Sequence, residues 1–317
     1  WDIKHVITSD SYKDVSVPTN EPQVRIQGGQ VLGRRIKSVS LEEDVQFTYN
    51  GTYVVTGGLG YVGQHIAQTL YDHGAGNIIL LSSSKDKLPD SWDRNFTPTV
   101  IKCDVSNKNE VFDVLKNTNN VRGIVHCAGV LSDKTLPNLT KEDWEIVYGA
   151  KVQGAYNIDE CVTELSLTPE FVVLCSSIAS GFGGAGQGNY AGANGALDKL
   201  ARERDNFVSI RWGAWVGGGM AMDETMVRAA RMGILGLDYK DAIAQFNNII
   251  SDMQHKVITV TPLDTDKLPP VPYFSSISTR KTNENVLSEL NSLQNTEERE
   301  QFVTKQVYEI AESLGID

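Results

Sequence analysis

One short stretch near the start of the chain limits its fold more than any other. Residues 53–55 read as a buried strand, and three glycines follow at a spacing of three residues, ending at Gly63. Apolar residues then recur every four positions, which predicts a helix that begins at Gly63. Glycines let the backbone approach a pyrophosphate closely, and the free N–H groups of a helix start attract its charge. A plain tight turn is the alternative, but the flanking strand and helix favour a dinucleotide site. The predicted cofactor residues of this turn are Thr56, Gly57, Gly58, Leu59, Gly60 and Gly63.

The composition is that of an acidic globular protein. The chain has 317 residues, 40% of them apolar, and a formal net charge of −11. This length favours two domains, or one large α/β domain with tails. The negative charge argues against nucleic acid or an anionic membrane as the main partner. The sequence leads us to expect no signal peptide, and it contains no apolar run long enough to span a membrane.

The cysteines favour structural thiols over a metal site. Cys103, Cys127, Cys161 and Cys175 form no Cys-x-x-Cys pair, and no histidine clusters with them. Reduced, buried thiols in a cytoplasmic protein are therefore expected, and no metal is predicted. Because the first residue is Trp1 and not Met, the chain is expected to be a piece of a longer protein.

From about residue 47, short apolar segments alternate with helical patterns. This alternation predicts a doubly wound, Rossmann-like parallel sheet of seven strands with helices on both faces. Ligands of such sheets lie at the carboxyl ends of the strands, so the turns after strands one, four, five and six should line one site. The predicted strands are 53–55, 78–81, 100–101, 124–128, 171–175, 208–211 and 257–260, and helices are expected from residue 63, near 111–115, over 144–158, over 190–204 and over 242–250.

Four segments are expected along the chain. Residues 1–45, which include a hairpin at 24–33, read as the trailing part of a preceding subdomain, and 46–272 as the nucleotide-binding catalytic domain. Residues 273–295 read as a polar linker, and 296–317 as an amphipathic helix with acids in its first turn. The glycine-rich stretch 217–236 is a candidate mobile lid, with an ordinary surface excursion as the alternative.

Four polar residues follow the glycine turn in an order that suits carbonyl reduction. Tyr190 and Asn194 lie one turn apart on a predicted helix, Ser177 ends the fifth strand, and Lys151 lies in the helix before that strand. A carbonyl that accepts hydride needs a proton donor, and a free phenol has a pKa of about 10. A nearby ammonium stabilises the phenolate and lowers that pKa, and a serine hydroxyl can hold the carbonyl oxygen.

Each of these four residues also has a plain structural explanation. A tyrosine at a helix start is usually packing, a Ser-Ser pair at a strand end is usually turn chemistry, and a helical lysine is usually solvated. Their joint order after a dinucleotide turn favours catalysis over the separate explanations.

With these residues in view, the chain resembles the ketoreductase domain of a modular polyketide synthase, a member of the short-chain dehydrogenase/reductase superfamily. The likeness spans about residues 46 to 270. Ordinary superfamily members carry Tyr-x-x-x-Lys, whereas here Asn194 takes the lysine position and Lys151 lies on the earlier helix, an exchange typical of the synthase reductases. The motifs that carry the resemblance are Thr56–Gly63, Cys103–Val105, His126–Val130, Lys151–Gly154, Ser176–Ile178, Gly186–Asn194 and Trp212–Trp215.

The resemblance implies a role for each of the four residues. Tyr190 would protonate a β-keto oxygen, Ser177 would orient it, and Lys151 with Asn194 would support the proton relay and the nicotinamide ribose. NADPH would deliver hydride to a β-ketoacyl group held as a thioester on an acyl carrier protein. Other domains of the same synthase are implied as partners, and neither nucleic acid nor membrane is.

Two departures from the family pattern concern the cofactor and the stereochemistry. The family arginine that binds the 2′-phosphate of NADPH is missing after the second strand, where Ser83 and Lys85 could still contact a phosphate. No acidic residue ends that strand, which disfavours NAD. The motif Leu-Asp-Asp of B-type reductases appears here as Leu131-Ser132-Asp133, and Phe182 stands where A-type reductases carry tryptophan. The further residues implied for the cofactor are Ser82, Ser83, Lys85, Asp104, Val105, Ala128 and Gly129, and those implied for substrate and stereocontrol are Leu131, Asp133, Gln187 and Met220.

The resemblance therefore implies B-type behaviour and a D-configured hydroxyl. The helix of residues 298–314 resembles the opening helix of an acyl carrier protein, without the serine that carries phosphopantetheine. A redox-inactive or epimerising relic of such a reductase is the main alternative, although all four catalytic positions are filled. A sugar epimerase or dehydratase of the same fold would need Tyr-x-x-x-Lys, which Asn194 contradicts, and a pure interaction module would not need Tyr190 or Lys151.

Overall fold

The computed structural model describes residues 5–7, 23–27, 30–41, 50–220, 223–269, 271–278, 290–293 and 295–314. The chain divides into two compact units. The larger unit comprises Leu41–Ala221 and Gly236–Thr261, and the smaller comprises Trp1–Ser40, Met222–Leu235 and Pro262–Asp317. All of the predicted site residues lie in the larger unit.

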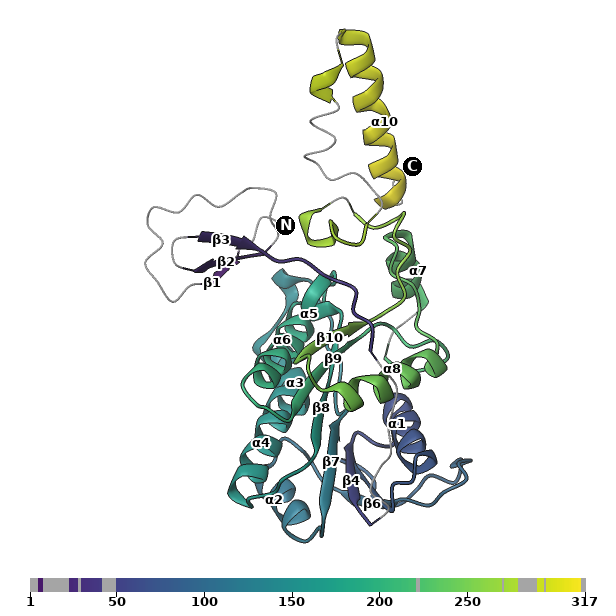
Figure 1. Cartoon of the computed structure of the whole chain (residues 1–317). Coiled ribbons are helices and arrows are strands. Elements are labelled where there is room, and N and C mark those ends of the chain that lie inside the picture. Colours follow the sequence, from purple (N-terminus) through teal and green to yellow (C-terminus); the bar gives the residue numbers. More distant parts are fainter. Residues whose placement is uncertain are drawn as a thin grey trace. The chain divides into compact units, whose positions relative to one another are not determined.

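The larger unit is built on the predicted parallel sheet, which the structure confirms (Figure 1). Its seven strands follow the order β10-β9-β8-β7-β4-β5-β6, and every pair of neighbours is parallel. Strand β4 lies between β5 and β7, so the direction of winding reverses there. The strands are β4 (Thr52–Thr56), β5 (Asn77–Ser82), β6 (Thr99–Lys102), β7 (Val121–His126), β8 (Phe171–Ser177), β9 (Phe207–Trp212) and β10 (Val257–Val260).

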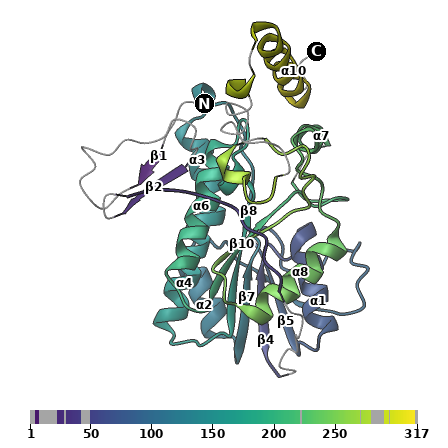
Figure 2. The same cartoon turned by 45° about the horizontal axis from the view of Figure 1, so that its top comes forward.

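Helices cover both faces of this sheet, and the alternation of side chains along each strand explains why. In β4, Tyr53 and Val55 join one buried cluster, whereas Val54 joins the cluster on the opposite face. Helices α1 and α8 pack on the first face, and α2, α4 and α6 pack on the second (Figure 2). The helices are α1 (Tyr61–Asp72), α2 (Lys108–Lys116), α3 (Lys141–Tyr148), α4 (Gly154–Glu164), α5 (Ala179–Phe182), α6 (Gly188–Arg202) and α8 (Tyr239–Asp252).

The expected long helix over residues 144–158 is not continuous. Helix α3 and helix α4 are joined by a π-helical turn, η2 (Gly149–Gln153), and Lys151 lies inside that turn. Helix α3 begins at a capping box in which Thr140 and Asp143 satisfy each other's backbone N–H groups. A π turn is wider than an α-helical turn and is frequent at functional sites.

Most element boundaries differ from those predicted by one to three residues, and three of these differences concern elements that carry site residues. Helix α1 begins at Tyr61, not at Gly63, because Gly60 already acts as its N-cap. Strand β7 ends at His126, so Ala128 lies in the turn beyond it. Helix α6 ends at Arg202, two residues early, and Arg204 beyond it pairs with Asp159 on α4.

The smaller unit contains the predicted hairpin and the predicted C-terminal helix. Strands β2 (Gln23–Gln27) and β3 (Gln30–Gly33) are antiparallel, and β1 (His5–Ile7) pairs with β2. The glycine-rich stretch 217–236 contains α7 (Asp223–Arg231), and the C-terminal helix α10 covers Thr296–Leu314. A short 3-10 turn, η3, covers Pro272–Phe274. Most of the expected linker lies outside the described residues, and no helix among the described residues has the length and apolarity of a membrane span.

Candidate active site

The predicted catalytic and cofactor residues gather at the carboxyl edge of the sheet. Thr56 ends β4, His126 ends β7 and Ser177 ends β8, and these three strands are neighbours. The reversal of winding between β5 and β7 opens a crevice for ligands at this edge in doubly wound sheets. The turns after β4, β7 and β8 thus meet, and they are three of the four turns that the sequence predicts to line one site.

The glycine positions of the turn after β4 have no space for a side chain. Gly57 has φ of 62°, and a Cβ atom there would lie 2.9 Å from the backbone nitrogen of Ala128. A Cβ atom on Gly63 would lie 2.6 Å from the carbonyl oxygen of Gly57. Helix α1 has Gly60 as N-cap, with no side-chain cap and no acidic residue in its first turn. Its N-terminus therefore fits the pyrophosphate of a dinucleotide.

The other predicted cofactor residues surround this turn. The Thr56 hydroxyl accepts a hydrogen bond of 3.2 Å from the backbone N–H of Ala128, which ties β4 to the turn after β7. The Ser82 hydroxyl accepts from the backbone N–H groups of Ser84 and Lys85, so it shapes the turn in which Ser83 and Lys85 are exposed. After β6, the Asp104 carboxylate accepts from Ser106 N–H at 2.9 Å, and Val105 is buried.

Lys151 is the buried cation of the site. Its side chain is 2% exposed, its Nζ donates to the Cys175 carbonyl at 2.9 Å, and Nζ lies 5.4 Å from the centre of the Tyr190 ring. Gly129 lies against the lysine, because a Cβ atom there would be 2.9 Å from Lys151 Cε. The structure thus brings together the amine and the phenol ring that the sequence predicts to act together.

Helix α6 carries Tyr190 and Asn194 in its first two turns. The Asn194 side-chain N–H donates to the Tyr190 carbonyl at 2.7 Å, so the amide is fixed on the tyrosine. Its Oδ1 atom is buried and has no hydrogen-bond partner among the residues that the structure describes. A buried acceptor without a donor fits a ligand hydroxyl, such as a cofactor ribose, because an unsatisfied buried acceptor costs about 1–3 kcal/mol.

Ser177 lies at the end of β8, at the start of the turn that leads into α5. Its hydroxyl oxygen accepts from Ala179 N–H at 3.2 Å, which leaves the hydroxyl proton for another acceptor. The Ser180 hydroxyl donates to the Ser177 carbonyl at 2.9 Å and lies 2.7 Å from the Asp198 carboxylate. The turn that carries the Ser177 hydroxyl is therefore held in place by the hydrogen bonds of Ser180.

A buried ion pair joins that turn to α6 and β9. Arg211 and Asp198 are 4% and 1% exposed, and their side chains are 2.6 Å apart. The Asp198 carboxylate also accepts from the Ser209 hydroxyl at 2.7 Å. Since Asp198 lies on the helix of Tyr190 and contacts the turn of Ser177 through Ser180, this pair fixes the two catalytic elements to each other.

Residues 131–140 form a loop that Asp143 fastens to the start of α3. The Asp143 carboxylate accepts from the Ser132 and Thr140 hydroxyls, each at 2.6 Å, and from Lys134 Nζ at 2.9 Å. These hydrogen bonds, that of Ser132 first, hold the pKa of the Asp143 carboxyl well below its usual range. The Asn189 amide donates to the carbonyls of Ser132 and Asp143.

The predicted stereocontrol residues lie mainly in and beside this loop. Asp133 accepts a hydrogen bond of 2.8 Å from the Gln187 amide, which precedes α6. Leu131 packs partly buried against the cluster that contains Tyr190. Met220 is 43% exposed and precedes residues 221–222, which lie outside the described residues, so its place at the substrate stays a prediction.

The four cysteines are free thiols, as predicted. Cys127 Sγ and Cys175 Sγ are 3.1 Å apart at the ends of neighbouring strands. The hydrogen bond between them raises the pKa of Cys127 and lowers that of Cys175. The two thiols thus share a hydrogen bond, and the backbone carbonyl of one of them, Cys175, accepts the hydrogen bond from Lys151 Nζ.

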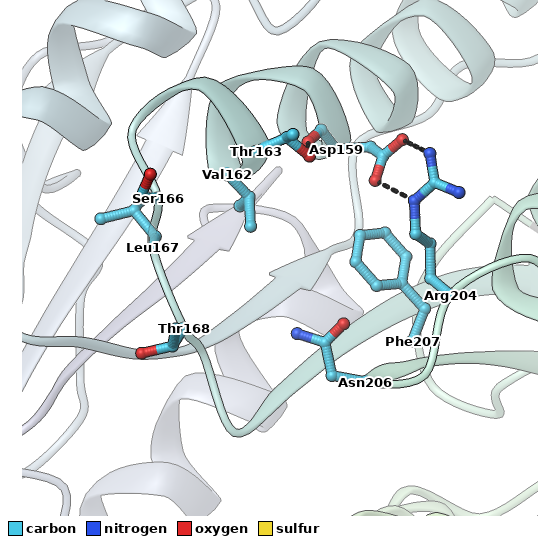
Figure 3. A pocket seen from close by; sticks show the side chains of 9 residues that line it. All are labelled: Asp159, Val162, Thr163, Ser166, Leu167, Thr168, Arg204, Asn206 and Phe207. Carbon is cyan, nitrogen blue, oxygen red and sulfur yellow. Dashed lines mark hydrogen bonds and ion pairs between the residues drawn. The ribbon is translucent and has the colours of Figure 1, made fainter.

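A surface cavity of about 300 Å³ lies away from this site (Figure 3). It is next to the beginnings of β8 and β9, between Thr168 and Phe207, whereas the catalytic residues are at the ends of those strands. Asp159 and Arg204 at its rim pair with each other through two hydrogen bonds of 2.7 Å. Its charged groups therefore satisfy each other, and it offers no catalytic arrangement.

Several site residues were not predicted from the sequence. His126, Asp143, Asn189 and the Asp198–Arg211 pair are all nearly or fully buried and polar. A histidine at the end of an otherwise apolar strand, directly before Ala128-Gly129, was the signal that could have marked His126. Asp143 forms a capping box with Thr140, three residues earlier, and that spacing was a local signal for it. The partners of Asn189 and of the Asp198–Arg211 pair are mostly distant in sequence.

The larger unit matches one family of known proteins. A model of the KR domain family matches residues 51–217. The chain is similar to polyketide synthase GfsA of Streptomyces halstedii, at 34% identity over 220 residues, which cover 64% of this chain and 3% of that protein. It is also similar to the phenolphthiocerol synthesis polyketide synthase type I Pks15/1 of Mycobacterium marinum, at 32% identity over 239 residues, which cover 69% of this chain and 11% of that protein.

Solved structures of polyketide synthase ketoreductases have the same fold. An A-type ketoreductase from a modular polyketide synthase aligns with a TM-score of 0.74 and 26% identity, over 81% of this chain and 59% of that chain. The first ketoreductase of the tylosin polyketide synthase aligns with a TM-score of 0.73 and 28% identity, over 81% of this chain and 60% of that chain. The chain spans only a small part of the curated relatives, 3% and 11% of the two named above.

Proposed function

The chain belongs to the ketoreductase domain family of polyketide synthases, and from this membership we propose that it reduces a β-ketoacyl thioester to a β-hydroxyacyl thioester with NADPH. The family and the short-chain dehydrogenase/reductase fold imply reduction of a β-keto group. The cofactor, the carrier of the substrate and the configuration of the product are the finer parts of the proposal.

The observation that carries the proposal is the contact of a buried ammonium with a phenol ring at the ligand edge of the sheet. Lys151 Nζ lies 5.4 Å from the centre of the Tyr190 ring, and both side chains are buried. A fully packed lysine without a carboxylate partner is rare in a protein core. A role in stabilising charge on a neighbouring group accounts for its position.

The chemistry needs a proton at the keto oxygen as hydride reaches the keto carbon. NADPH, when bound, supplies the hydride. The Tyr190 phenol donates the proton, the Ser177 hydroxyl donates a hydrogen bond to the same oxygen, and the Lys151 ammonium stabilises the phenolate that remains. Asn194 Oδ1, the buried acceptor without a partner, is available to a ribose hydroxyl. A well-placed general acid contributes roughly 10²–10⁴-fold to such a reaction.

The residues around the glycine turn support NADPH as the cofactor. Gly57, Gly60 and the start of α1 would hold the pyrophosphate, and Asp104 with Val105 would border the adenine. Ser83 and Lys85 are exposed on the turn after β5, where a 2′-phosphate would lie. The lysine supplies positive charge there, and no carboxylate ends β5 to favour a free ribose hydroxyl.

The substrate would be presented by an acyl carrier protein, and the product would have the D-configuration. Known relatives are polyketide synthases with further domains, which supports a carrier-bound substrate and partners within the same synthase. Asp133 is held toward α6 by Gln187, and Phe182 takes the place of the A-type tryptophan. Leu131 and Met220 are proposed to border the acyl chain.

Reduction of a racemic 2-methyl-3-ketoacyl N-acetylcysteamine thioester, followed by chiral analysis of the product, tests these points together. We expect NADPH consumption matched by a D-hydroxyl product, and slower consumption of NADH. Tyr190→Phe should abolish turnover and keep NADPH binding, measured by fluorescence. A wild-type chain that binds NADPH and reduces no thioester would support the redox-inactive alternative, and an L-hydroxyl product would overturn the stereochemical part.

A further inference from the structure

His126 is a fully buried histidine that lies between two parts of the site. It ends β7 with 0% exposure. Its Nδ1 atom is 2.8 Å from the Thr56 hydroxyl at the cofactor turn, and its Nε2 atom is 2.9 Å from the Lys151 carbonyl oxygen. The imidazole therefore connects the cofactor turn directly to the backbone of the catalytic lysine.

The partners of the ring fix its tautomer. A carbonyl oxygen only accepts hydrogen bonds, so Nε2 must donate to Lys151. Nδ1 of the neutral ring is then an acceptor, and the Thr56 hydroxyl donates to it. The same hydroxyl oxygen accepts from the Ala128 N–H at 3.2 Å, so the hydrogen bonds run in one direction from Ala128 to Lys151.

Burial keeps this ring neutral. Desolvation, with a smaller contribution from the charge of Lys151, lowers the pKa of His126 to about 4, although the hydrogen bond to the Lys151 carbonyl acts in the opposite direction. At neutral pH the ring thus has one donor and one acceptor, each with a partner. Its single N–H proton is engaged by the Lys151 carbonyl, so the ring is not placed as a proton donor to a substrate.

The contact to Lys151 is made inside the π turn. Residues 149–153 follow π-helical geometry, which departs from the surrounding α-helix at the residue whose amine reaches the Tyr190 ring. The ring also packs closely on the end of this turn, since a Cβ atom on Gly154 would be 2.9 Å from His126 Cε1. The direction of the lysine side chain follows from the backbone that His126 holds.

From this geometry we propose that His126 is a positioning residue for Lys151, acting through its Nε2–H group and the π turn, and that it couples this turn to the cofactor turn through Thr56. The inference rests on the proposed reductase function for its kinetic consequence. Its structural content, the placement of the amine against the phenol, does not depend on that function.

Two amide variants separate the two contacts of the ring. In His126→Gln the amide nitrogen reaches the place of Nε2 and can still donate to Lys151. In His126→Asn the amide reaches only the place of Nδ1, so the contact to Thr56 remains and the contact to Lys151 is lost. We expect His126→Asn to lower kcat by about ten- to a hundredfold with an unchanged KM for NADPH, and His126→Gln to retain most of kcat.

His73→Asn is the matched control, because His73 follows α1, where its Nδ1 contacts Thr69 and its Nε2 lies 3.4 Å from the Asn247 amide, and none of these residues belongs to the proposed site. It should leave kcat unchanged. Equal losses in His126→Gln and His126→Asn, or no loss in either, would overturn the proposal. A loss in His126→Asn through KM for NADPH alone would do so as well.

Gly154→Ala provides a second route if His126→Asn does not fold. The added methyl group, on the residue that follows η2, would lie 2.9 Å from His126 Cε1 and 2.8 Å from Val105 Cγ2. We expect kcat to fall as in His126→Asn, and the KM for NADPH reports the separate effect on Val105. Gly149→Ala, within η2, would meet its nearest atom at an ordinary 3.7 Å and should keep kcat. Equal kcat values for these two alanine variants would also overturn the proposal.

A readout without catalysis distinguishes failure of this inference from failure of the proposed function. Tyrosine labelled with ¹³C at Cζ gives an NMR signal for residue 190 that Tyr190→Phe removes. In the free protein the ¹³C chemical shift of this signal should change in His126→Asn, as in Lys151→Met, because the ammonium no longer lies against the ring. It should stay near the wild-type value in His126→Gln. Those changes would support the inference even in a chain that reduces nothing, and identical chemical shifts for all variants would overturn it.

Discussion

The Lys151 amine and the Tyr190 ring meet at 5.4 Å although the two residues lie on different helical segments, and the lysine reaches this place from within a π turn. In members of the superfamily with Tyr-x-x-x-Lys, one helix carries both groups. Here helix packing has to bring them together, so the geometry of the site depends on how η2 and α6 are held against the sheet.

Lys151→Met should remove the charge and keep the apolar stem. We expect kcat for the thioester to fall by about a hundredfold or more, because the phenolate loses its neighbouring cation, while NADPH still binds. Steady-state kinetics with a fluorescence titration of NADPH measures both. Lys199→Met on α6, where the lysine is exposed and pairs with Glu203, is the control and should keep full activity.

Gly129→Ala should lower activity with little loss of stability. The added Cβ would be 2.9 Å from Lys151 Cε, and a lysine side chain can swing aside, so the fold tolerates the methyl group while the amine moves. In Gly195→Ala the methyl group on α6 meets no other atom within 4 Å. We expect the free energy of unfolding to rise by about 0.4–1 kcal/mol and kcat to stay unchanged. Kinetics and thermal unfolding of both variants check this. Full activity of Gly129→Ala would contradict it.

Asp143→Asn should loosen the loop of residues 131–140. The folded pKa of this carboxyl lies below its ordinary value of about 3.9, so the charged form stabilises the fold above that pH, and this stability is lost as pH falls through the folded value. The variant should therefore have a lower Tm at pH 7 and a flatter decline of Tm below pH 4. The rate of proteolytic cleavage within residues 131–140 measures the loosening of the loop. It should rise in Asp143→Asn and not in the control variant Glu142→Gln.

His126 should make the fold sensitive to mild acid. Its folded pKa of about 4 lies below the ordinary value of about 6.5, so stability is full above pH 6.5 and falls between pH 6.5 and 4, by about 3 kcal/mol. Urea unfolding from pH 7 to pH 4.5 measures this slope. His126→Gln, which cannot be protonated there, should show a shallower slope, and an identical slope would contradict the assignment.

Arg211→Met should destabilise the larger unit by about 3–5 kcal/mol, because it leaves the Asp198 carboxylate buried without its cation. Replacing both partners, in Asp198→Leu with Arg211→Met, should cost less than Arg211→Met alone. Chemical denaturation of the two variants measures the difference. A larger loss in the double variant would mean that the serine partners Ser180 and Ser209 outweigh the arginine.

The sheet could be predicted from the sequence because its strands are short apolar runs with regular spacing. Strand β4 and strand β8 lie within a residue or two of their predicted bounds. The start of α1 was wrong by two residues because its N-cap is Gly60, which has no side chain to mark the position. The Lys151 amine lies 5.4 Å from the centre of the Tyr190 ring, a proximity expected from residue types and order rather than from spacing, and the joint catalytic role of the two residues stays a prediction.

The π turn and the buried polar contacts could not be predicted. The residues of η2 have ordinary helical character, and only the partners that meet them in the fold select the wider geometry. The proposed role of His126 depends on its hydrogen bonds to Thr56 and Lys151, which are 70 and 25 residues away in sequence. Such contacts are set by tertiary packing, so a single sequence carries no local pattern for them.

The π turn also bears on how a chain of this kind tolerates insertions and deletions. One residue rotates an α-helix by about 100°, so removal of a single residue from Gly149–Gln153 would restore a regular helix and point the lysine along a different direction. Every catalytic side chain would still be present in such a chain, yet the amine would no longer face the phenol. Alignment of catalytic residues alone would score that shortened chain as intact, although its active site would be disassembled.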